Sequence, residues 1–348
     1  MYYKDLKSFS LDEMKSIFVE MGEKEYRAIQ TFKFIHQNMA NSIDDITVLS
    51  KGLRDKLNKN FNISCTSIAE RYDSNIDNTK KYLFQLEDGN IIESVVMEYR
   101  HGTTACISTQ VGCKMGCAFC ASTKGGLIRN LSSGEILSQV YNIQNDLDIK
   151  LSNIVLMGSG EPLDNYENVI KFLSILHDEN GQNFSYRNIT LSTCGLVPKI
   201  YKLAEEELPI TLSISLHSPF NEERKKIMPI ARVYSLDELL DACRYYIDKN
   251  NRRITFEYTL IKGINDRKED LNELSRILKG LLCHINLISL NPIEEFAKDK
   301  VNKNTIEMFK RELSKNGIPV TIRREMGSDI NAACGQLRRK YISKGDHV

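Results

Sequence analysis

The spacing of apolar side chains divides the chain into three stretches. From residue 1 to about residue 62, apolar positions recur every three or four residues, which is the period of an amphipathic helix. The first such stripe consists of Leu11, Met14, Ile17, Phe18 and Met21. Similar stripes predict further helices near residues 26–35 and 45–61. Because this stretch contains no cysteine and no recognisable catalytic group, we interpret residues 1–62 as a helical accessory domain.

In the second stretch the period falls towards two, the period of β-strands. Two runs rich in apolar residues, at 81–88 and 91–99, flank Gly89 and Asn90. This pairing of two strand patterns around a short turn is typical of a β-hairpin. We therefore expect a β-hairpin connector over residues 63–100.

In the third stretch, residues 101–348, short β-rich runs alternate with helical runs. The strand runs are 105–109, 153–158, 188–193, 209–215, 253–261, 284–292 and 319–324. The helical runs are 132–143, 165–178, 199–207, 235–249, 268–280 and 305–317. This alternation predicts an α/β fold with a parallel sheet, as a closed barrel, a partial barrel or a doubly wound sheet. In each of these, functional groups gather at the carboxyl ends of the strands.

Composition narrows the class of protein. With 348 residues, 41% of them apolar and 27% charged, the chain resembles a folded globular enzyme rather than a disordered protein. The 47 basic and 46 acidic residues leave a net charge of +1, so contact with a nucleic acid would depend on local patches. No run approaches the roughly 18 apolar residues of a membrane helix, and the N-terminus has no signal sequence. We expect a cytoplasmic protein that does not contact membranes.

The chain has nine cysteines, and in a reducing compartment clustered cysteines are more often metal ligands or catalytic groups than disulfides. Three of them, Cys113, Cys117 and Cys120, lie directly after the first strand run of the third stretch. A structural zinc site normally takes four ligands, and no second Cys or His pair follows. Three thiolates on one loop can instead hold three irons of a [4Fe-4S] cluster and leave the fourth open. The spacing therefore favours the cluster over zinc.

The motif Cys-x3-Cys-x-Phe-Cys resembles the signature of the radical S-adenosylmethionine superfamily. The segments around it resemble the RlmN family of RNA methyltransferases within that superfamily, and they occur in the family's order. These segments are ACISTQVGCKMGCAFCASTKGGL, GEPLDNY, LSTCGLVPKI, SISLHSP, TFEYTLIKGIND, HINLISLNP and TIRREMGSDINAACGQL. The resemblance implies a partial (β/α)6 barrel over residues 101–348, with Cys113, Cys117 and Cys120 as the ligands of a [4Fe-4S] cluster.

The resemblance also implies which residues bind S-adenosylmethionine. They all lie at or just after expected strand ends: Gly160, Glu161, Ser192, Ser215, Leu216, His217 and Asn291. Their polar atoms could hold the cofactor's ribose, amine and carboxylate by hydrogen bonds. Taken alone, a Ser or Asn in such a position is more typical of a turn or a helix cap.

Three further residues receive catalytic roles from the resemblance. Cys334, on a C-terminal loop, takes a methyl group from one S-adenosylmethionine, because a thiolate is a competent nucleophile. A second S-adenosylmethionine supplies the radical that activates this methyl group for addition to adenine. Cys106 then attacks the sulfur of Cys334 to form a transient disulfide, while Glu93 accepts the proton from the ring carbon. Without the resemblance, the two cysteines would be interpreted as small buried hydrophobes and Glu93 as a solvent-facing strand carboxylate.

The other four cysteines, Cys65, Cys194, Cys243 and Cys283, match no such role, and we assign them to packing.

The implied substrates are RNAs. They are an adenosine in the peptidyl-transferase centre of 23S rRNA and adenosine 37 of some tRNAs, each becoming 2-methyladenosine. No acidic residue occurs from Tyr99 to Gly134, and we expect the basic residues there to form a phosphate-binding rim, although each alone would be interpreted as solvated surface. They are Arg100, Lys114, Lys124 and Arg129, with further basic residues at 51–59 and in the C-terminal tail, among them Arg323 and Arg324. We expect a monomer that receives electrons from an external donor such as flavodoxin or ferredoxin.

Two other functions remain open. An enzyme of the related Cfr type would methylate carbon 8 of the same rRNA adenosine and confer antibiotic resistance. A non-catalytic iron-sulfur sensor that binds RNA would have no need of Cys106, Cys334 or the dispersed cofactor positions.

Overall fold

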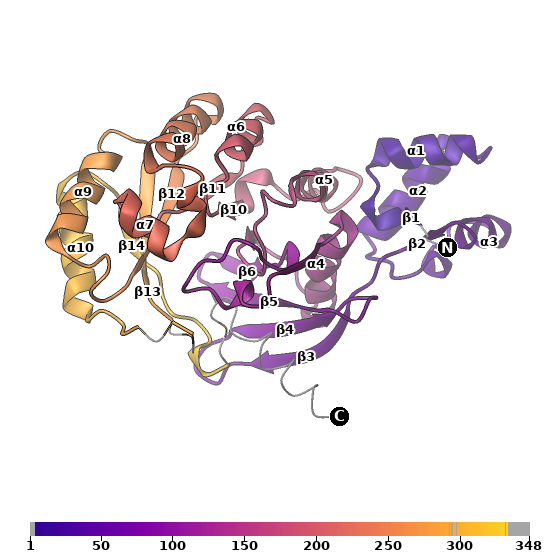
Figure 1. Ribbon diagram of the computed structural model, residues 1–348. Helices are drawn as coiled ribbons and strands as arrows, with labels where there is room; N and C mark the ends of the chain where they lie inside the picture. Colours follow the sequence, from indigo (N-terminus) through magenta and orange to yellow (C-terminus); the bar gives the residue numbers. More distant parts are fainter. Residues whose placement is uncertain (1–3, 292, 294, 297, 331, 333–348) are drawn as a thin grey trace.

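A ten-stranded sheet is the central feature of the computed structural model, which describes residues 4–291, 293, 295–296, 298–330 and 332 (Figure 1). The strand order is β14-β13-β12-β11-β10-β9-β6-β5-β4-β3. Its parallel part comprises β6 (Gly102–Cys106), β9 (Asn153–Leu156), β10 (Ile189–Thr193), β11 (Thr211–Ser215), β12 (Ile254–Leu260), β13 (Cys283–Ser289) and β14 (Val320–Ile322). These strands confirm all seven predicted strand runs. Since β14 forms one edge and β6 continues into antiparallel strands, the barrel is partial.

Helices cover one face of the parallel strands (Figure 1). They are α4 (Ser133–Leu147), α5 (Tyr166–His177), α6 (Val197–Glu205), α8 (Leu236–Asn250), α9 (Lys268–Leu278) and α10 (Lys303–Lys315). The strands turn alternate apolar side chains such as Leu191, Leu212 and Phe256 into the core, and these are completely buried. Ser132 and Ser235 begin α4 and α8 with capping boxes, each stabilising its helix by about 1 kcal/mol.

The opposite face of the same strands carries polar side chains. The register places Ser192 beside Ser213 and Ser215 beside Glu257, and Glu257 is in turn beside Asn286. Glu257 is buried but accepts hydrogen bonds from Ser213 Oγ at 3.0 Å and from Asn286 Nδ2 at 3.1 Å. A buried polar face that is hydrogen-bonded in this way is suited to binding a polar ligand.

Three antiparallel strands continue the sheet beyond β6: β3 (Ser67–Asp73), β4 (Lys80–Gln85) and β5 (Ile91–Tyr99). The predicted hairpin is confirmed as β4 and β5, whose turn contains Gly89 with a φ of 81°. The strand β3 adds to the hairpin. Because β5 pairs with β6, the hairpin and the parallel strands share one continuous sheet.

The N-terminal helices are α1 (Leu11–Glu20), α2 (Glu25–His36) and α3 (Lys51–Asn58). The third helix begins later than predicted, because Ser42 caps a separate 3₁₀ turn at Ile43–Asp45. Two buried polar contacts join the N-terminal segment to α4, one from Lys7 before α1 and one from His36 at the end of α2. Lys7 Nζ donates to Ser138 Oγ at 3.0 Å, and His36 Nδ1 lies 2.8 Å from the hydroxyl of Tyr141.

One helix, α7 (Asn221–Ile227), is not predicted by apolar periodicity. Five of its seven residues are charged, so it has no apolar stripe. It leads directly into a 3₁₀ turn at Pro229–Arg232, and the two together pack against the cysteine loop. Within the part of the chain that the structure describes, no helix is both long and apolar enough to cross a bilayer.

Candidate active site

Cys113, Cys117 and Cys120 lie on a loop that follows β7 (Gln110–Gly112). The loop is closed by backbone hydrogen bonds from Cys113 N–H to the carbonyl of Gly126 at 3.0 Å and from Cys120 N–H to the carbonyl of Cys117 at 3.2 Å. Cys113 and Cys117 are buried and Cys120 is half-buried. The closed loop holds the three thiols near one another in an environment that excludes most water.

Burial within this loop opposes ionisation of the free thiols, so a bound cation must displace their protons. Burial raises the pKa of Cys113 to about 12, and burial together with the neighbouring thiolates raises the pKa of Cys117 as well. Free thiols at these positions are therefore protonated at neutral pH, and metal binding would release protons. In the described ranges no three His, Cys, Asp or Glu side chains are close enough to share a single metal ion. A cubane cluster binds each thiolate through a different iron, so this donor set fits a [4Fe-4S] cluster.

The predicted cofactor residues lie together at the carboxyl edge of the parallel strands. Gly160 and Glu161 follow β9, and Ser192 is the last residue but one of β10. Ser215 ends β11 and is followed by Leu216 and His217, while Asn291 comes two residues after β13. The fold therefore brings all seven positions to one edge, as expected for ligand-binding groups in an α/β sheet.

Gly160 and Glu161 form a tight junction between β9, β10 and β7. Gly160 has a φ of 110°, and a Cβ at this position would lie 2.6 Å from Cβ of Gln110. Glu161 is buried, which raises its pKa, while its carboxylate accepts backbone hydrogen bonds from Cys194 at 2.8 Å and from Leu163 at 3.1 Å. The carboxylate therefore also joins the ends of β9 and β10.

His217 is fixed in one neutral tautomer. The backbone N–H of Thr259 donates to His217 Nδ1 at 3.0 Å, so the ring proton resides on Nε2. Burial and the nearby Arg224 lower the pKa of His217 to about 3. Its ring packs edge-on against Phe119 with a centroid distance of 4.8 Å. Phe119 lies between two of the loop cysteines, so His217 links the cysteine loop to the end of β11.

Glu93 and Cys106 lie on one face of the sheet. The register sets Val95 of β5 opposite Cys106 of β6, and Glu93, two residues before Val95, shares its face. Both Glu93 and Cys106 are buried, with 8% and 6% of their surfaces exposed. The burial of Glu93 excludes the interpretation as a solvent-facing strand carboxylate. Cys334, their predicted partner, lies outside the described residues.

The chain that leads towards Cys334 is attached to the turn between β3 and β4. Asp329 accepts hydrogen bonds from Ser74 Oγ and from the backbone N–H of Asn75, both at 2.7 Å. The backbone N–H of Gly327 donates to Asp77 at 3.0 Å. The segment at 327–330 is therefore attached to the antiparallel part of the sheet.

Two of the basic residues near the cysteine loop form ion pairs with carboxylates. Arg129 forms ion pairs with Asp88 at 2.6 Å and with Glu135 at 2.8 Å, and Lys114 forms one with Asp164 at 2.8 Å. Acidic residues from outside the stretch, Asp88, Glu135 and Asp164, thus neutralise a stretch that has none of its own. Two of the four basic residues expected to form the phosphate-binding rim, Lys114 and Arg129, are thus ion-paired with carboxylates.

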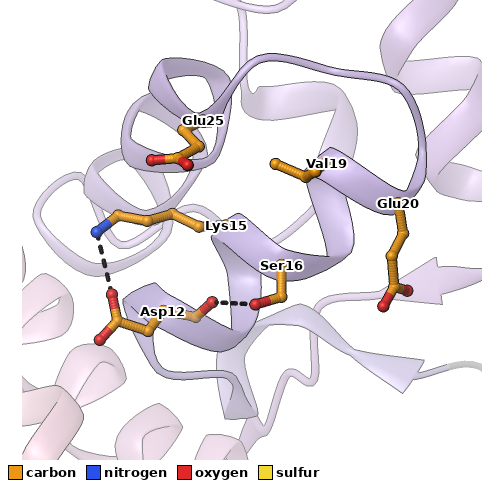
Figure 2. Close-up of a pocket in the computed structure, with 6 residues that line it drawn as sticks. All are labelled: Asp12, Lys15, Ser16, Val19, Glu20 and Glu25. Carbon is orange, nitrogen blue, oxygen red and sulfur yellow. Dashed lines mark hydrogen bonds and ion pairs between the residues drawn. The ribbon is translucent and has the colours of Figure 1, made fainter.

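A surface pocket on α1 and α2 lies outside the predicted site (Figure 2). It is lined by Asp12, Lys15, Ser16, Val19, Glu20 and Glu25. Lys15 and Asp12 form an exposed ion pair at 3.0 Å, and Ser16 donates to a backbone carbonyl of its own helix. No residue of this pocket has a predicted role.

Comparison with known proteins identifies the family. The Radical SAM superfamily profile matches residues 107–275, and the ribosomal RNA large subunit methyltransferase N-terminal domain matches residues 4–63. A probable dual-specificity RNA methyltransferase RlmN of Clostridium novyi is 56% identical, over 97% of this chain and 99% of its own. The corresponding protein of Clostridioides difficile is 55% identical over 97% and 98%.

The chain belongs to the RlmN family. A solved structure supports the fold as well. The crystal structure of a radical SAM methyltransferase from Sphaerobacter thermophilus is similar at a TM-score of 0.91 and 42% identity, covering 96% of this chain and 98% of that one. The matching profiles, relatives and solved structure confirm the fold class and the resemblance predicted from sequence. Membership of the family also implies a [4Fe-4S] cluster and S-adenosylmethionine.

Several residues of the site were not predicted. Gln110 accepts a hydrogen bond from Glu161 N–H at 2.8 Å and donates to Asp164 at 2.9 Å. Arg224 of α7 and Cys194, which was assigned to packing, lie beside the cysteine loop. Phe119 could have been predicted as part of the site, because it is the Phe of the Cys-x3-Cys-x-Phe-Cys motif. Nothing local in the sequence indicates that Arg224 is buried.

Proposed function

We propose that this RlmN-family chain is an enzyme that converts adenosine to 2-methyladenosine in two RNAs. The substrates are the adenosine of the peptidyl-transferase centre of 23S rRNA and adenosine 37 of some tRNAs. The observation that carries the proposal is the placement of Glu93 and Cys106 on one face of the sheet, on strands that adjoin the three-cysteine loop. The names of the relatives at 56% and 55% identity support the two RNA substrates.

Cys113, Cys117 and Cys120 would hold the cluster. Gly160, Glu161, Ser192, Ser215, Leu216, His217 and Asn291 would hold S-adenosylmethionine at the carboxyl edge of the sheet. When bound, these groups supply the methyl group, the reducing electron and the radical chemistry that an unactivated adenine carbon requires. The neutral Nε2–H of His217 is available as a donor of fixed direction, because its tautomer is set by Thr259.

The chemistry of the chain's own residues centres on two thiols and one carboxylate. Cys334 carries the methyl group as S-methylcysteine and becomes bonded to the adenine through it. Glu93 takes the proton from C2, and the one electron that radical addition leaves on the ring would return to the bound cluster. Cys106 then attacks the Cys334 sulfur, so that an S–S bond forms as the carbon–sulfur bond breaks, and the electron pair of that bond stays with the methylene carbon, which takes up a proton to become the methyl group. An external reductant then resets the two cysteines. The electron donor is a protein such as flavodoxin or ferredoxin, and two S-adenosylmethionine molecules are used per turnover. The burial of Glu93 keeps water from competing for this proton.

Each part of the chain has its own role in this reaction. Residues 1–62 form a helical accessory domain, residues 63–100 supply Glu93, and residues 101–348 form the catalytic core with its C-terminal loop. We place the enzyme in the cytoplasm, where its RNA substrates are found, and as a monomer.

Product analysis tests the proposal. The full-length protein is incubated anaerobically with reductant, S-adenosylmethionine and unmodified 23S rRNA or tRNA, and the digested RNA is separated by chromatography. We expect 2-methyladenosine from both RNAs. A product methylated at carbon 8 would identify a Cfr-type enzyme, and intact cofactor with unmodified RNA would identify a sensor. A Cys106→Ala variant should leave RNA covalently attached to the protein, and a Cys334→Ala variant should not.

A further inference from the structure

Arg224 is a buried cation beside the cysteine loop. Only 1% of its surface is exposed. Its guanidinium donates to three backbone carbonyls, from Nη2 to Cys194 at 2.7 Å and to Ser215 at 3.1 Å, and from Nε to Leu216 at 3.1 Å. These carbonyls belong to the ends of β10 and β11, so the side chain joins two of the segments predicted to bind S-adenosylmethionine.

These three partners are all neutral. Among the residues that the structure describes, no aspartate or glutamate forms an ion pair with Arg224. Other buried charges in this chain do have a partner of opposite sign: Asp270 is paired with Arg267 at 2.8 Å, and Glu257 lies 3.8 Å from Arg323. Because a buried charge without a counter-charge is strongly unfavourable, the neutral surroundings of Arg224 call for an anion.

The ionisable groups that interact with the charge of Arg224 are thiols. The side chains whose ionised forms would interact with its charge are Cys194, Cys117 and Cys243. Cys117 and Cys194 belong to one apolar cluster with Ile227 and Met228, which lie three and four residues after Arg224 along the chain. The N–H of Ala118 donates to the carbonyl of Ile227 at 2.9 Å, which ties the cysteine loop to the last residue of α7. Arg224 lies one helical turn before this residue.

We propose that Arg224 is the buried counter-charge of the cluster thiolates. This inference rests on the proposed function, since it requires the cluster held by Cys113, Cys117 and Cys120. A fixed positive charge in a site that excludes water stabilises the more negative, reduced state of a cluster and so raises its reduction potential. The same guanidinium holds the ends of β10 and β11 in place. Arg224 is thus a positioning residue that also makes the site easier to reduce.

Two substitutions separate charge from hydrogen bonding. Arg224→Lys keeps the charge but loses the planar set of donors, whereas Arg224→Gln keeps donors for the carbonyls and removes the charge. Lys225→Met is the matched control, because Lys225 is a part-exposed cation on the same helix that is paired with Glu222 at 2.7 Å. Each full-length protein is reconstituted anaerobically with iron and sulfide. Its cluster content is measured by iron analysis, and its midpoint potential by a redox titration monitored by electron paramagnetic resonance.

We expect Arg224→Gln to make reduction of the cluster at least tenfold less favourable, which for one electron is about 59 mV. Arg224→Lys should stay near the wild-type potential, and Lys225→Met should not change it. A fully loaded Arg224→Gln protein with the wild-type potential would overturn the inference, as would a shift in Arg224→Lys alone. An Arg224→Gln chain that does not fold even without cluster would also overturn it, since the role would then be structural. A wild-type protein that assembles no cluster would instead refute the proposed function.

Discussion

At the residue scale, Gly160 shows how closely the site is packed. Its φ of 110° lies in the region that favours glycine, and the space where a side chain would begin is filled by Gln110. Gln110 in turn holds Glu161 N–H, Asn130 and Asp164 at 2.7 to 2.9 Å. The position is therefore constrained both by backbone conformation and by contact.

We predict that Gly160→Ala destabilises this junction by about 1–3 kcal/mol, from backbone strain and the displaced Gln110, and weakens S-adenosylmethionine binding at least tenfold. Equilibrium dialysis with labelled cofactor would measure the affinity, and urea unfolding the stability. Gly125→Ala is the control, because Gly125 lies on the cysteine loop and has open space where a Cβ would be added. Equal affinities for the two variants would contradict the predicted role of Gly160.

Two buried histidines give the fold a dependence on pH. Burial lowers the pKa of His36 and of His217 to about 3, from an ordinary value of 6.5 in the unfolded chain. Between these values the unfolded chain binds protons that the folded chain does not. The free energy of unfolding therefore falls as pH falls below about 6.5, by roughly 1.4 kcal/mol per pH unit for each histidine.

We predict that His36→Gln reduces this loss by the contribution of one histidine. Urea unfolding of the wild type and the variant at pH 7.5 and pH 5 measures it. His177→Gln is the control, because His177 lies near the surface and its hydrogen bond to the carbonyl of Phe184 is exposed. If His36→Gln and the wild type lose the same stability between the two pH values, His36 is not responsible.

At the scale of elements, the sequence predicted regular repeats well and local exceptions poorly. All seven strand runs and the six long helices of the third stretch were predicted, because alternation and amphipathic periodicity are set by burial on one face. The helix α7 was missed because its charged residues carry no apolar stripe, and with it Arg224. The strand β3 was missed as part of the hairpin segment because its side chains are mostly exposed.

The candidate site, too, was predicted from the sequence only in part. Cys113, Cys117 and Cys120 follow from a motif, and the strand-end residues follow from the family resemblance, with which the sheet topology agrees. By contrast, the ion pairs of Arg129 and Lys114 join residues distant in sequence, so a charge count along the chain could not reveal them.

The segment at 327–330 is an element whose attachment has a testable consequence. Asp329→Ala would remove its two hydrogen bonds to the β3–β4 turn, and we expect lower yields of methylated RNA because the chain leading to Cys334 is less well positioned. The cluster content should not change, since the cysteine loop is not involved. Glu325→Gln is the control, because Glu325 takes part in a surface ion pair with Lys300, worth about 0–1 kcal/mol. A loss of cluster in Asp329→Ala, or equal yields for both variants, would contradict this assignment.

At the scale of the whole molecule, charge is balanced both in composition and in space. The overall net charge is only +1, and near the cysteine loop Asp88, Glu135 and Asp164 neutralise the basic residues Arg129 and Lys114. A protein of this kind gains little from long-range attraction to phosphates. It can release its RNA after each turnover more easily than a strongly basic protein could.

This balance predicts a weak dependence of RNA binding on salt, to which individual residues contribute unequally. Lys124 is exposed on the cysteine loop and has no carboxylate partner in the described part of the chain, so Lys124→Gln should lower the slope of log K against log salt by about 1. Arg129→Gln should leave the slope nearly unchanged, because Asp88 and Glu135 already occupy its guanidinium. Filter binding of tRNA from 50 to 200 mM salt, about the range over which phosphate contacts are resolved, measures both slopes. If Arg129→Gln lowers the slope as much as Lys124→Gln, Arg129 must leave its two carboxylates when RNA binds, and the neutralised surface would then be a feature of the free protein alone.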